Sequence, residues 1–254
     1  GIWKMRLSRV WIGVFLVNLC LQLGFGTWTL KHTQPGSKPP PRELSAGVYC
    51  SKLELALFTF GRDFTSTIDD AWGLTNDGNW LKWVPVNMTG DIVLPRYGHS
   101  ISIVADENTH CDIVLFGGHI KLKSNFEVVH GIDMNSQSYF LGRVRMNKST
   151  VSIEWKSFLP SNIGPGPLAL HSTVSDASSN STSIFVYGGI SVNSSASNYP
   201  LWRLSVHLVD KSIRAEWKRL APSGPQPPVS VLSSATILGT HIAFFGGQPR
   251  SYAS

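Results

Sequence analysis

Three short apolar runs in this chain each end in a pair of glycines, at Val114–Gly118, Ile184–Gly189 and Ile242–Gly247. A fourth run, Ala56–Arg62, keeps one glycine and has Arg62 in the place of the second. The glycine pairs are Gly117 with Gly118, Gly188 with Gly189, and Gly246 with Gly247. An apolar run that ends in two glycines is typical of a strand buried on both faces, followed by a tight turn. Its recurrence predicts a repeat architecture of small stacked sheets.

Tryptophans recur in step with the glycine pairs. Trp83, Trp155 and Trp217 each stand 16 residues before an equivalent position, which is occupied by His99, His171 and Ser233. A buried tryptophan supplies a large apolar surface, so each is predicted to pack one sheet against the next.

Each unit is predicted to contain four short strands. The third strand is expected at Asp70–Leu74, Val129–Asp133 and Leu201–Ser205, and the fourth carries the tryptophan. Two long connections follow from these assignments. Residues 134–151 would join the third and fourth strands of one unit, and residues 175–183 the first and second strands of the next.

The segment Pro95–Ser100, the three glycine pairs, the segment Asn198–Leu204 and the three tryptophans resemble the kelch repeat. The resemblance implies an all-β fold, a partial kelch-type β-propeller of four-stranded antiparallel blades. The units would span 44–84, 94–156, 166–218 and a truncated 230–254, and His99 and His171 would be structural repeat positions. A closed propeller needs at least four blades, so the chain is predicted to be part of a longer propeller.

The first 26 residues predict a signal peptide that starts at Met5. Arg6 and Arg9 precede an apolar run from Val10 to Leu23. This run of about 14 residues is shorter than the roughly 20 that a spanning helix needs. We therefore expect no stable membrane span after cleavage. The alternatives are an uncleaved anchor and a buried helix. Residues 27–43 are rich in proline and are predicted to be a stiff linker.

Four sequons support a secreted or luminal location. They predict N-glycosylation at Asn87, Asn147, Asn180 and Asn193, which would require all four to be exposed. Removal of the signal would remove Cys20 and leave Cys50 and Cys111, which an oxidising compartment could join as a disulfide. The alternative is that the two cysteines are small buried apolar residues.

The composition narrows the possible functions. Charged residues make up 15% of the chain, too few for a disordered or coiled-coil protein. The net charge is +6, but the basic residues are scattered, so no nucleic-acid partner is expected. The sequence contains no G-x-S-x-G elbow, phosphate-binding loop, C-x-x-C or H-x-x-x-H pattern. We therefore predict no catalytic residue, metal or cofactor.

The function that these features favour is binding of a protein partner through the connections between strands. The basic residues Arg143, Arg145 and Lys148 of the expected loop could meet an acidic partner, but the favoured interpretation is a solvated loop that carries a glycan at Asn147. Two other functions stay open. The chain could be a truncated relative of the copper-radical oxidases, whose fold is related, or a cytosolic kelch scaffold with a misread N-terminus.

Overall fold

The structure is a computed structural model that describes residues 33–76, 78, 80–123, 128–132, 139–148, 150–177, 181–191, 201–209, 212–221 and 227–249. All of them belong to one compact unit, Thr33–Ser254. The predicted signal peptide, the start of the predicted linker, and the sequons at Asn180 and Asn193 lie outside the described residues. Over the described ranges, no helix has the length and apolar character needed to cross a membrane.

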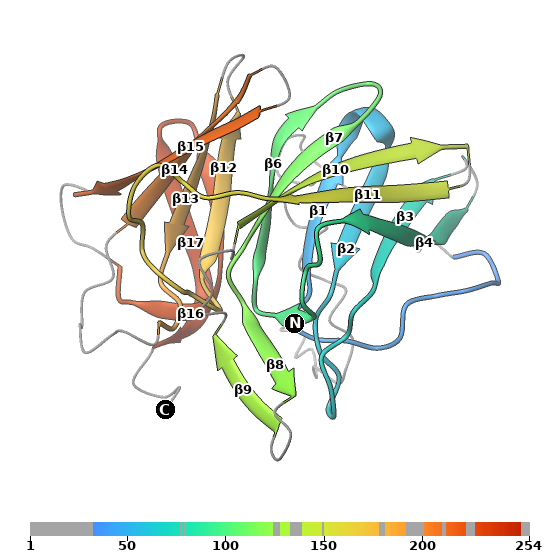
Figure 1. Cartoon of the computed structure of the whole chain (residues 1–254), viewed down its shortest axis with the longest axis horizontal. Helices are drawn as coiled ribbons and strands as arrows, with labels where there is room; N and C mark the ends of the chain where they lie inside the picture. Colours follow the sequence, from blue (N-terminus) through green and yellow to red (C-terminus); the bar gives the residue numbers. More distant parts are fainter. Residues whose placement is uncertain are drawn as a thin grey trace, which may run out of the picture. The chain divides into compact units, whose positions relative to one another are not determined.

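The described chain is almost entirely β-strand, with one short 3-10 turn, η1 (Ser51–Leu53). Its strands form four consecutive modules (Figure 1). The first module contains β1 (Ala46–Cys50), β2 (Leu55–Thr59), β3 (Ala71–Asn76) and β4 (Leu81–Gly90). The second contains β6 (Ser100–Asp106), β7 (Cys111–Phe116), β10 (Tyr139–Asn147) and β11 (Thr150–Ser157). The third contains β12 (Ser172–Ala177), β13 (Thr182–Tyr187), β14 (Leu201–Val209) and β15 (Ser212–Leu220). The fourth contains β16 (Ser230–Leu238) and β17 (His241–Pro249).

Strands within each module are antiparallel and follow one another in chain order. The first strands of successive modules pack side by side, β1 on β6, β6 on β12, and β12 on β16. The outer strands of the first two modules also pair, because Val86–Gly90 of β4 runs parallel to Val151–Trp155 of β11. The result is an eight-stranded sheet, β1-β2-β3-β4-β11-β10-β7-β6, that nearly closes on itself within an all-β, propeller-like fold.

Strand β7 shows why these modules stack. All six of its residues are buried, as expected for an apolar run that precedes a glycine pair. Alternate side chains of a strand point to opposite faces. Ile113 and Leu115 therefore enter a core shared with the first module, and Val114 and Phe116 enter a core shared with the third. Trp155 lies in the first core and Trp217 in the second, as predicted. Trp83 departs from the prediction, because it is only partly buried and its ring contacts Phe58 of its own module.

The third strand of the second module differs from the prediction. Residues Val128–Ile132 form β9, which pairs with β8 (His119–Lys123) and, through it, with β5 (Arg96–Tyr97), in a separate three-stranded sheet. The third position of the module belongs to β10. The predicted 134–151 loop is therefore wrong. Strand β10 fits this position because Phe140 and Val144 enter one core while Tyr139 and Leu141 enter the other.

Two further predictions need correction. The connection expected over 175–183 is short, since β12 continues to Ala177 and β13 begins at Thr182. In the first module the glycine pair corresponds to Phe60 and Gly61. Their φ angles of 50° and 108° match the 70° and 100° of Gly117 and Gly118. The first unit therefore lacks its first glycine, at Phe60, rather than its second, at Arg62.

Candidate binding face and module junctions

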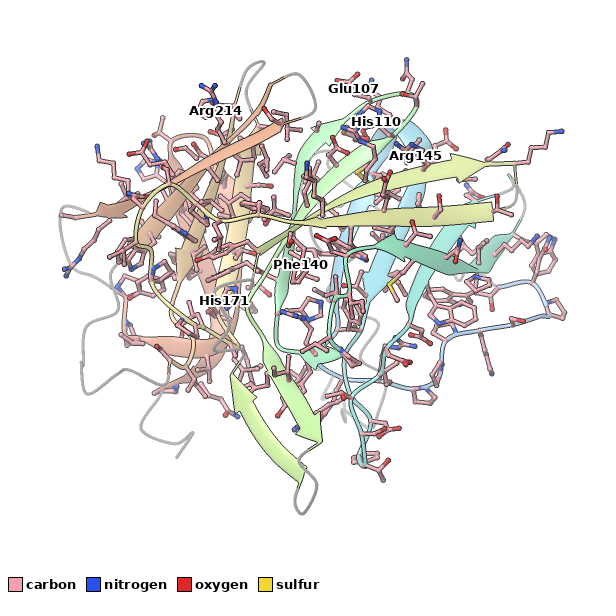
Figure 2. The ribbon with its side chains drawn as sticks, in the orientation of Figure 1. Glu107, His110, Phe140, Arg145, His171 and Arg214 are labelled. Carbon is pink, nitrogen blue, oxygen red and sulfur yellow. A yellow bond between two sulfur atoms is a disulfide. The ribbon has the colours of Figure 1, made fainter. Side chains whose placement is uncertain are left out.

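The two ends of the strands differ in the length of their connections. At one end, turns of two to four residues join first to second strands and third to fourth strands. At the other end, the connections run from 60 to 70, 91 to 99, 117 to 138, 158 to 171, 188 to 200 and 221 to 229. We call this second end the long-loop face. The β8–β9 hairpin extends from it at the bottom of Figure 1. In Figure 2, Glu107 and His110 mark the opposite end, on the short β6–β7 turn.

The long-loop face presents apolar side chains to solvent. Phe64 is fully exposed in the 60–70 connection. Its turn is well ordered, because the Asp63 carboxylate accepts hydrogen bonds from the backbone N–H groups of Thr65 and Ser66, both at 2.7 Å. These bonds lower the pKa of Asp63. Other exposed apolar side chains in the long connections are Ile92, Leu94, Leu159 and Ile163.

A cation and two rings lie beside this turn. The Arg62 guanidinium lies 4.8 Å from the centroid of the Tyr97 ring and pairs with Glu43 at 2.7 Å. The other contact of Tyr97 is with His119, whose ring stacks on it at a centroid distance of 5.1 Å. Tyr97 is buried, so the stack fixes β5 on β8, and the Arg62 contact ties both to the first module. Arg62 is partly exposed and lies two residues before Phe64 in the same connection.

Backbone hydrogen bonds join successive modules at the long-loop end. Gly98 N–H donates to Leu44 (2.9 Å), Leu170 N–H to Gly98 (2.8 Å) and Leu232 N–H to Leu170 (3.1 Å). All four residues have positive φ angles, between 56° and 66°. Left-handed backbone is costly for leucine, so the surrounding contacts must hold these residues in place. These left-handed junction positions were not predicted from the sequence, because leucine does not indicate a positive φ angle.

The residues at the second glycine position make another series of backbone hydrogen bonds between modules. Gly61, Gly118 and Gly189 donate their N–H groups to the carbonyls of Arg96, Leu168 and Ser230 in the following unit, at 2.9 to 3.0 Å. The first glycine allows this approach. A Cβ atom on Gly117 would lie 2.1 Å from the Leu168 carbonyl oxygen, and one on Gly188 would lie 2.2 Å from that of Ser230. The glycine pairs therefore bring neighbouring modules into backbone contact.

Each junction also contains a side-chain hydrogen bond, made by the residue that directly follows Gly98, Leu170 or Leu232. His99 Nε2 lies 2.9 Å from Thr59 Oγ1, and His171 Nε2 lies 2.9 Å from Ser100 Oγ. At the third junction the equivalent Ser233 Oγ lies 2.5 Å from Ser172 Oγ. Both histidine rings are buried and contact a phenylalanine of the preceding module. Their position supports the structural role that the repeat pattern predicts.

Burial keeps both imidazoles neutral. It lowers the pKa of His171 to about 3. It also lowers the pKa of His99 well below 6.5, and the positive charges of Arg96 and His171 add to the effect. Arg96 itself is buried, donates to the Gly117 carbonyl at 2.9 Å and lies over the Phe140 ring at 5.4 Å. Arg96 lies within the Pro95–Ser100 segment that resembles the kelch repeat, but the sequence gives no sign that its side chain is buried.

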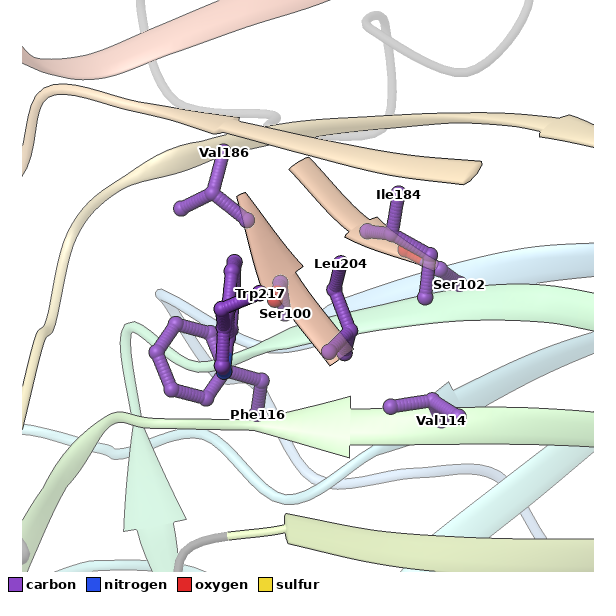
Figure 3. A pocket seen from close by; sticks show the side chains of 8 residues that line it. All are labelled: Ser100, Ser102, Val114, Phe116, Ile184, Val186, Leu204 and Trp217. Carbon is purple, nitrogen blue, oxygen red and sulfur yellow. The ribbon is translucent and has the colours of Figure 1, made fainter. Parts of the chain in front are cut away.

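The space between the second and third modules is filled by side chains. Figure 3 shows the eight residues that line it. They are Ser100, Ser102, Val114, Phe116, Ile184, Val186, Leu204 and Trp217. They leave no room for a water-sized molecule. Trp217 Nε1 donates to the Tyr139 hydroxyl at 3.2 Å, and burial raises the pKa of Tyr139 to about 12. This seam holds the modules together and offers no ligand pocket.

A disulfide joins Cys50 at the end of β1 to Cys111 at the start of β7. Both cysteines are fully buried. Beside the disulfide, the Asp106 carboxylate accepts hydrogen bonds from the backbone N–H of Ser51 at 2.8 Å and from its hydroxyl at 2.7 Å. These contacts tie the first two modules together at the short-turn end.

The two described sequon asparagines are exposed. Asn87 lies on the outer strand β4, and Asn147 lies at the β10–β11 turn. The basic residues of the predicted 134–151 loop lie on β10 or in the β10–β11 turn, and two of them form ion pairs. Arg143 makes a two-pronged pair with Asp112, both contacts at 2.8 Å, and Arg145 pairs with Glu154 at 3.0 Å. Within the described ranges no three His, Cys, Asp or Glu side chains gather as metal ligands would.

Comparison with known proteins adds to the fold and not to the function. The sequence matches no protein-family model and no curated protein. One similar solved structure is a chain in the cryo-EM structure of RAG in complex with one melted RSS and one unmelted RSS. The two chains share 17% identity and a TM-score of 0.55, over 84% of this chain and 60% of that chain. This chain thus spans less than two thirds of the other, and at such low identity the likeness shows the fold alone.

Proposed function

We propose that this chain folds as kelch-type propeller blades and binds a protein partner through its long-loop face. The observation that carries the proposal is the unequal length of the connections at the two ends of the strands. In repeat proteins, insertions gather on the face that binds, because loops on a rigid scaffold can vary without disturbing the core. Here every long connection leaves from the same end.

The chemistry of that face supports a protein partner. Phe64 offers a large apolar surface on a turn that is already ordered, so little conformational entropy is lost when a partner covers it. Arg62, partly exposed two residues before Phe64, supplies a cation of the residue type that is enriched in protein interfaces.

The kelch assignment is part of the proposal. It is supported by the three four-strand modules, by the glycine pairs that follow the second strands of the second and third modules, and by the tryptophan on the fourth strand of each of these three modules.

A binding screen tests the proposed function. The full chain, secreted from cultured cells, would be screened against an array of defined extracellular and luminal protein domains. We expect at least one partner whose affinity falls about tenfold or more in Phe64→Ser, since truncating an interface anchor typically costs over 1 kcal/mol. Leu238→Ser removes an exposed leucine from the short β16–β17 turn and serves as the control. Equal loss in both variants, or loss in the control alone, would contradict the proposal.

We also propose that the protein is made in the secretory pathway and is glycosylated at Asn87 and Asn147. Both side chains are accessible to a glycan. Treatment with an endoglycosidase should increase the gel mobility of the protein from cultured cells. The increase should shrink in Asn87→Gln and again in Asn87→Gln/Asn147→Gln. Unchanged mobility of the untreated and treated wild type would argue for a cytosolic protein.

A further inference from the structure

Two of the three module junctions depend on a buried histidine. His99 and His171 occupy equivalent places, each directly after a left-handed residue of the junction series. Each uses Nε2 to bond a hydroxyl group of the preceding module, and each leaves Nδ1 buried without a hydrogen-bond partner among the described residues. In a neutral imidazole one ring nitrogen carries no proton. The protonated ring carries an N–H on both nitrogens, so Nδ1 would donate toward a buried side where no described acceptor receives it, and Nε2 could no longer accept from the hydroxyl group.

The groups around these rings oppose a positive charge. Arg96 lies close to His99 and also donates to the carbonyl of Gly117, next to which the His171 ring packs. On the first-module side, Phe60 packs against His99, and its carbonyl accepts a hydrogen bond from Arg42.

Arg42 is itself paired with Asp70 at 2.5 Å, so this carboxylate is already engaged. The remaining charged influence on His99 is His171, which would be a second cation once protonated. Around His171 the neighbours are the Phe116 ring and the Ser100 hydroxyl, and burial alone accounts for its lowered pKa.

The third junction provides an internal comparison. Ser233 stands where the two histidines stand and bonds Ser172 across the same kind of junction. A hydroxyl group performs the linking role there without a group that titrates between pH 5 and 8. The fold therefore does not require an imidazole at this position.

We propose that His99 and His171 make the junctions between the first three modules acid-sensitive, holding the modules together at neutral pH and releasing them when the protein enters an acidic environment.

The sign and size of the effect follow from proton linkage. The unfolded or opened state takes up protons on both histidines near pH 6.5, whereas the folded state does so only at much lower pH. Between these limits the opened state binds more protons, so stability falls as the pH falls. At pH 5.0, each histidine should raise the opening equilibrium constant about 30-fold, and the pair about a thousandfold.

Denaturant unfolding of the full chain at pH 7.0 and pH 5.0, followed by tryptophan fluorescence, tests the proposal. The comparison is between the wild type and His99→Gln/His171→Gln, since a glutamine amide can replace the Nε2 hydrogen bond without titrating. Acidification should raise the unfolding constant of the wild type about a thousandfold more than that of the double variant. His241→Gln, at an exposed site on β17, should behave like the wild type. Equal acid sensitivity of the wild type and the double variant would overturn the proposal.

A measurement on the unaltered protein covers the case in which the double variant does not fold. The imidazole resonances of His99 and His171 would be followed by NMR from pH 7.5 down to the onset of opening. We expect neither folded-state resonance to titrate above pH 5. Folded-state titration of both rings near pH 6.5 would show that they accept a proton in place and would refute the proposal. The test needs no binding partner, so its result is independent of the proposed function.

Discussion

At the scale of single residues, the glycine pairs show that a repeat position is defined by backbone geometry more than by residue type. Phe60 has a φ angle of 50° where the other modules have glycine, and Gly61 then makes the bond to Arg96 that Gly118 makes to Leu168. A sequence alignment matches glycine to glycine and therefore places the first module's pair one residue too late. The backbone angles show the correct register.

The glycine positions allow a matched test. Gly117 and Gly246 have nearly the same φ, 70° and 71°, but a Cβ atom on Gly117 would clash with the Leu168 carbonyl, whereas Gly246 has open space around it. Gly246→Ala should cost only the left-handed backbone penalty, roughly 1–2 kcal/mol. Gly117→Ala should cost more than about 3 kcal/mol, because a backbone carbonyl must also move. Denaturant unfolding measures both. Similar losses would mean that the junction tolerates a side chain.

At the scale of the strand, β10 contributes both apolar side chains to the core and arginines to ion pairs. Its alternate residues enter two cores, and two of its arginines make different kinds of ion pair. Arg143 satisfies Asp112, whose side chain is 1% exposed and which also lies 3.6 Å from His110 Nε2. Arg145 pairs with Glu154 in solvent. The buried Asp112 carboxylate needs Arg143 to compensate its charge, whereas Glu154 is solvated by water.

The two arginines predict unequal effects of the same substitution. Arg143→Met keeps much of the side-chain volume but leaves a buried carboxylate with reduced compensation, so we expect a loss of about 3 kcal/mol. Arg145→Met, two residues away on the same strand, should cost less than about 1 kcal/mol, because exposed ion pairs contribute little. Thermal or denaturant unfolding at pH 7 distinguishes them. A larger loss of stability in Arg145→Met than in Arg143→Met would contradict this prediction, because the exposed pair would then contribute more to the free energy of unfolding than the buried one.

At the scale of the whole molecule, the first two modules are joined more extensively than the others. Their outer strands pair directly, their inner strands pack together, and the Cys50–Cys111 disulfide joins the end strand β1 to β7, the neighbour of the other end strand β6. The second and third modules meet through a filled apolar seam and backbone bonds at the junction. On acidification, the junction at His171 should therefore open before the disulfide-linked junction at His99.

The disulfide can be tested by its removal. It closes a loop between residues 61 positions apart, which corresponds to about 4 kcal/mol in the chain-entropy description. Cys50→Ala/Cys111→Ala should lose stability of this order, and addition of a reductant should lower the wild type toward the same value while leaving the variant unchanged. A wild type that is indifferent to reductant, with two reactive thiols when unfolded, would show that the bond does not form in the protein.

Much of the architecture was predictable from residues alone. Apolar runs before glycine pairs predicted the buried second strands, and the tryptophan spacing correctly predicted core positions for Trp155 and Trp217 but not for Trp83. Both predictions rest on the spacing of apolar residues within short segments, which can be read from the sequence. The same reasoning failed for β9, because His130 and Gly131 match the expected spacing of a third strand while lying in a separate sheet.

What the sequence determined by itself is thus the repeating unit and the type of fold, since hydrophobic period and glycine placement are properties of short segments. Only the tertiary structure decided which strand completes the second module, that the long connections share one end, and that His99 and His171 are buried across junctions. The histidine hydrogen bonds join residues 40 and 71 positions apart, and β10 pairs with a strand that lies beyond the intervening β8–β9 hairpin. Such contacts arise from the packing of one module on the next, and no pattern within a single repeat encodes them.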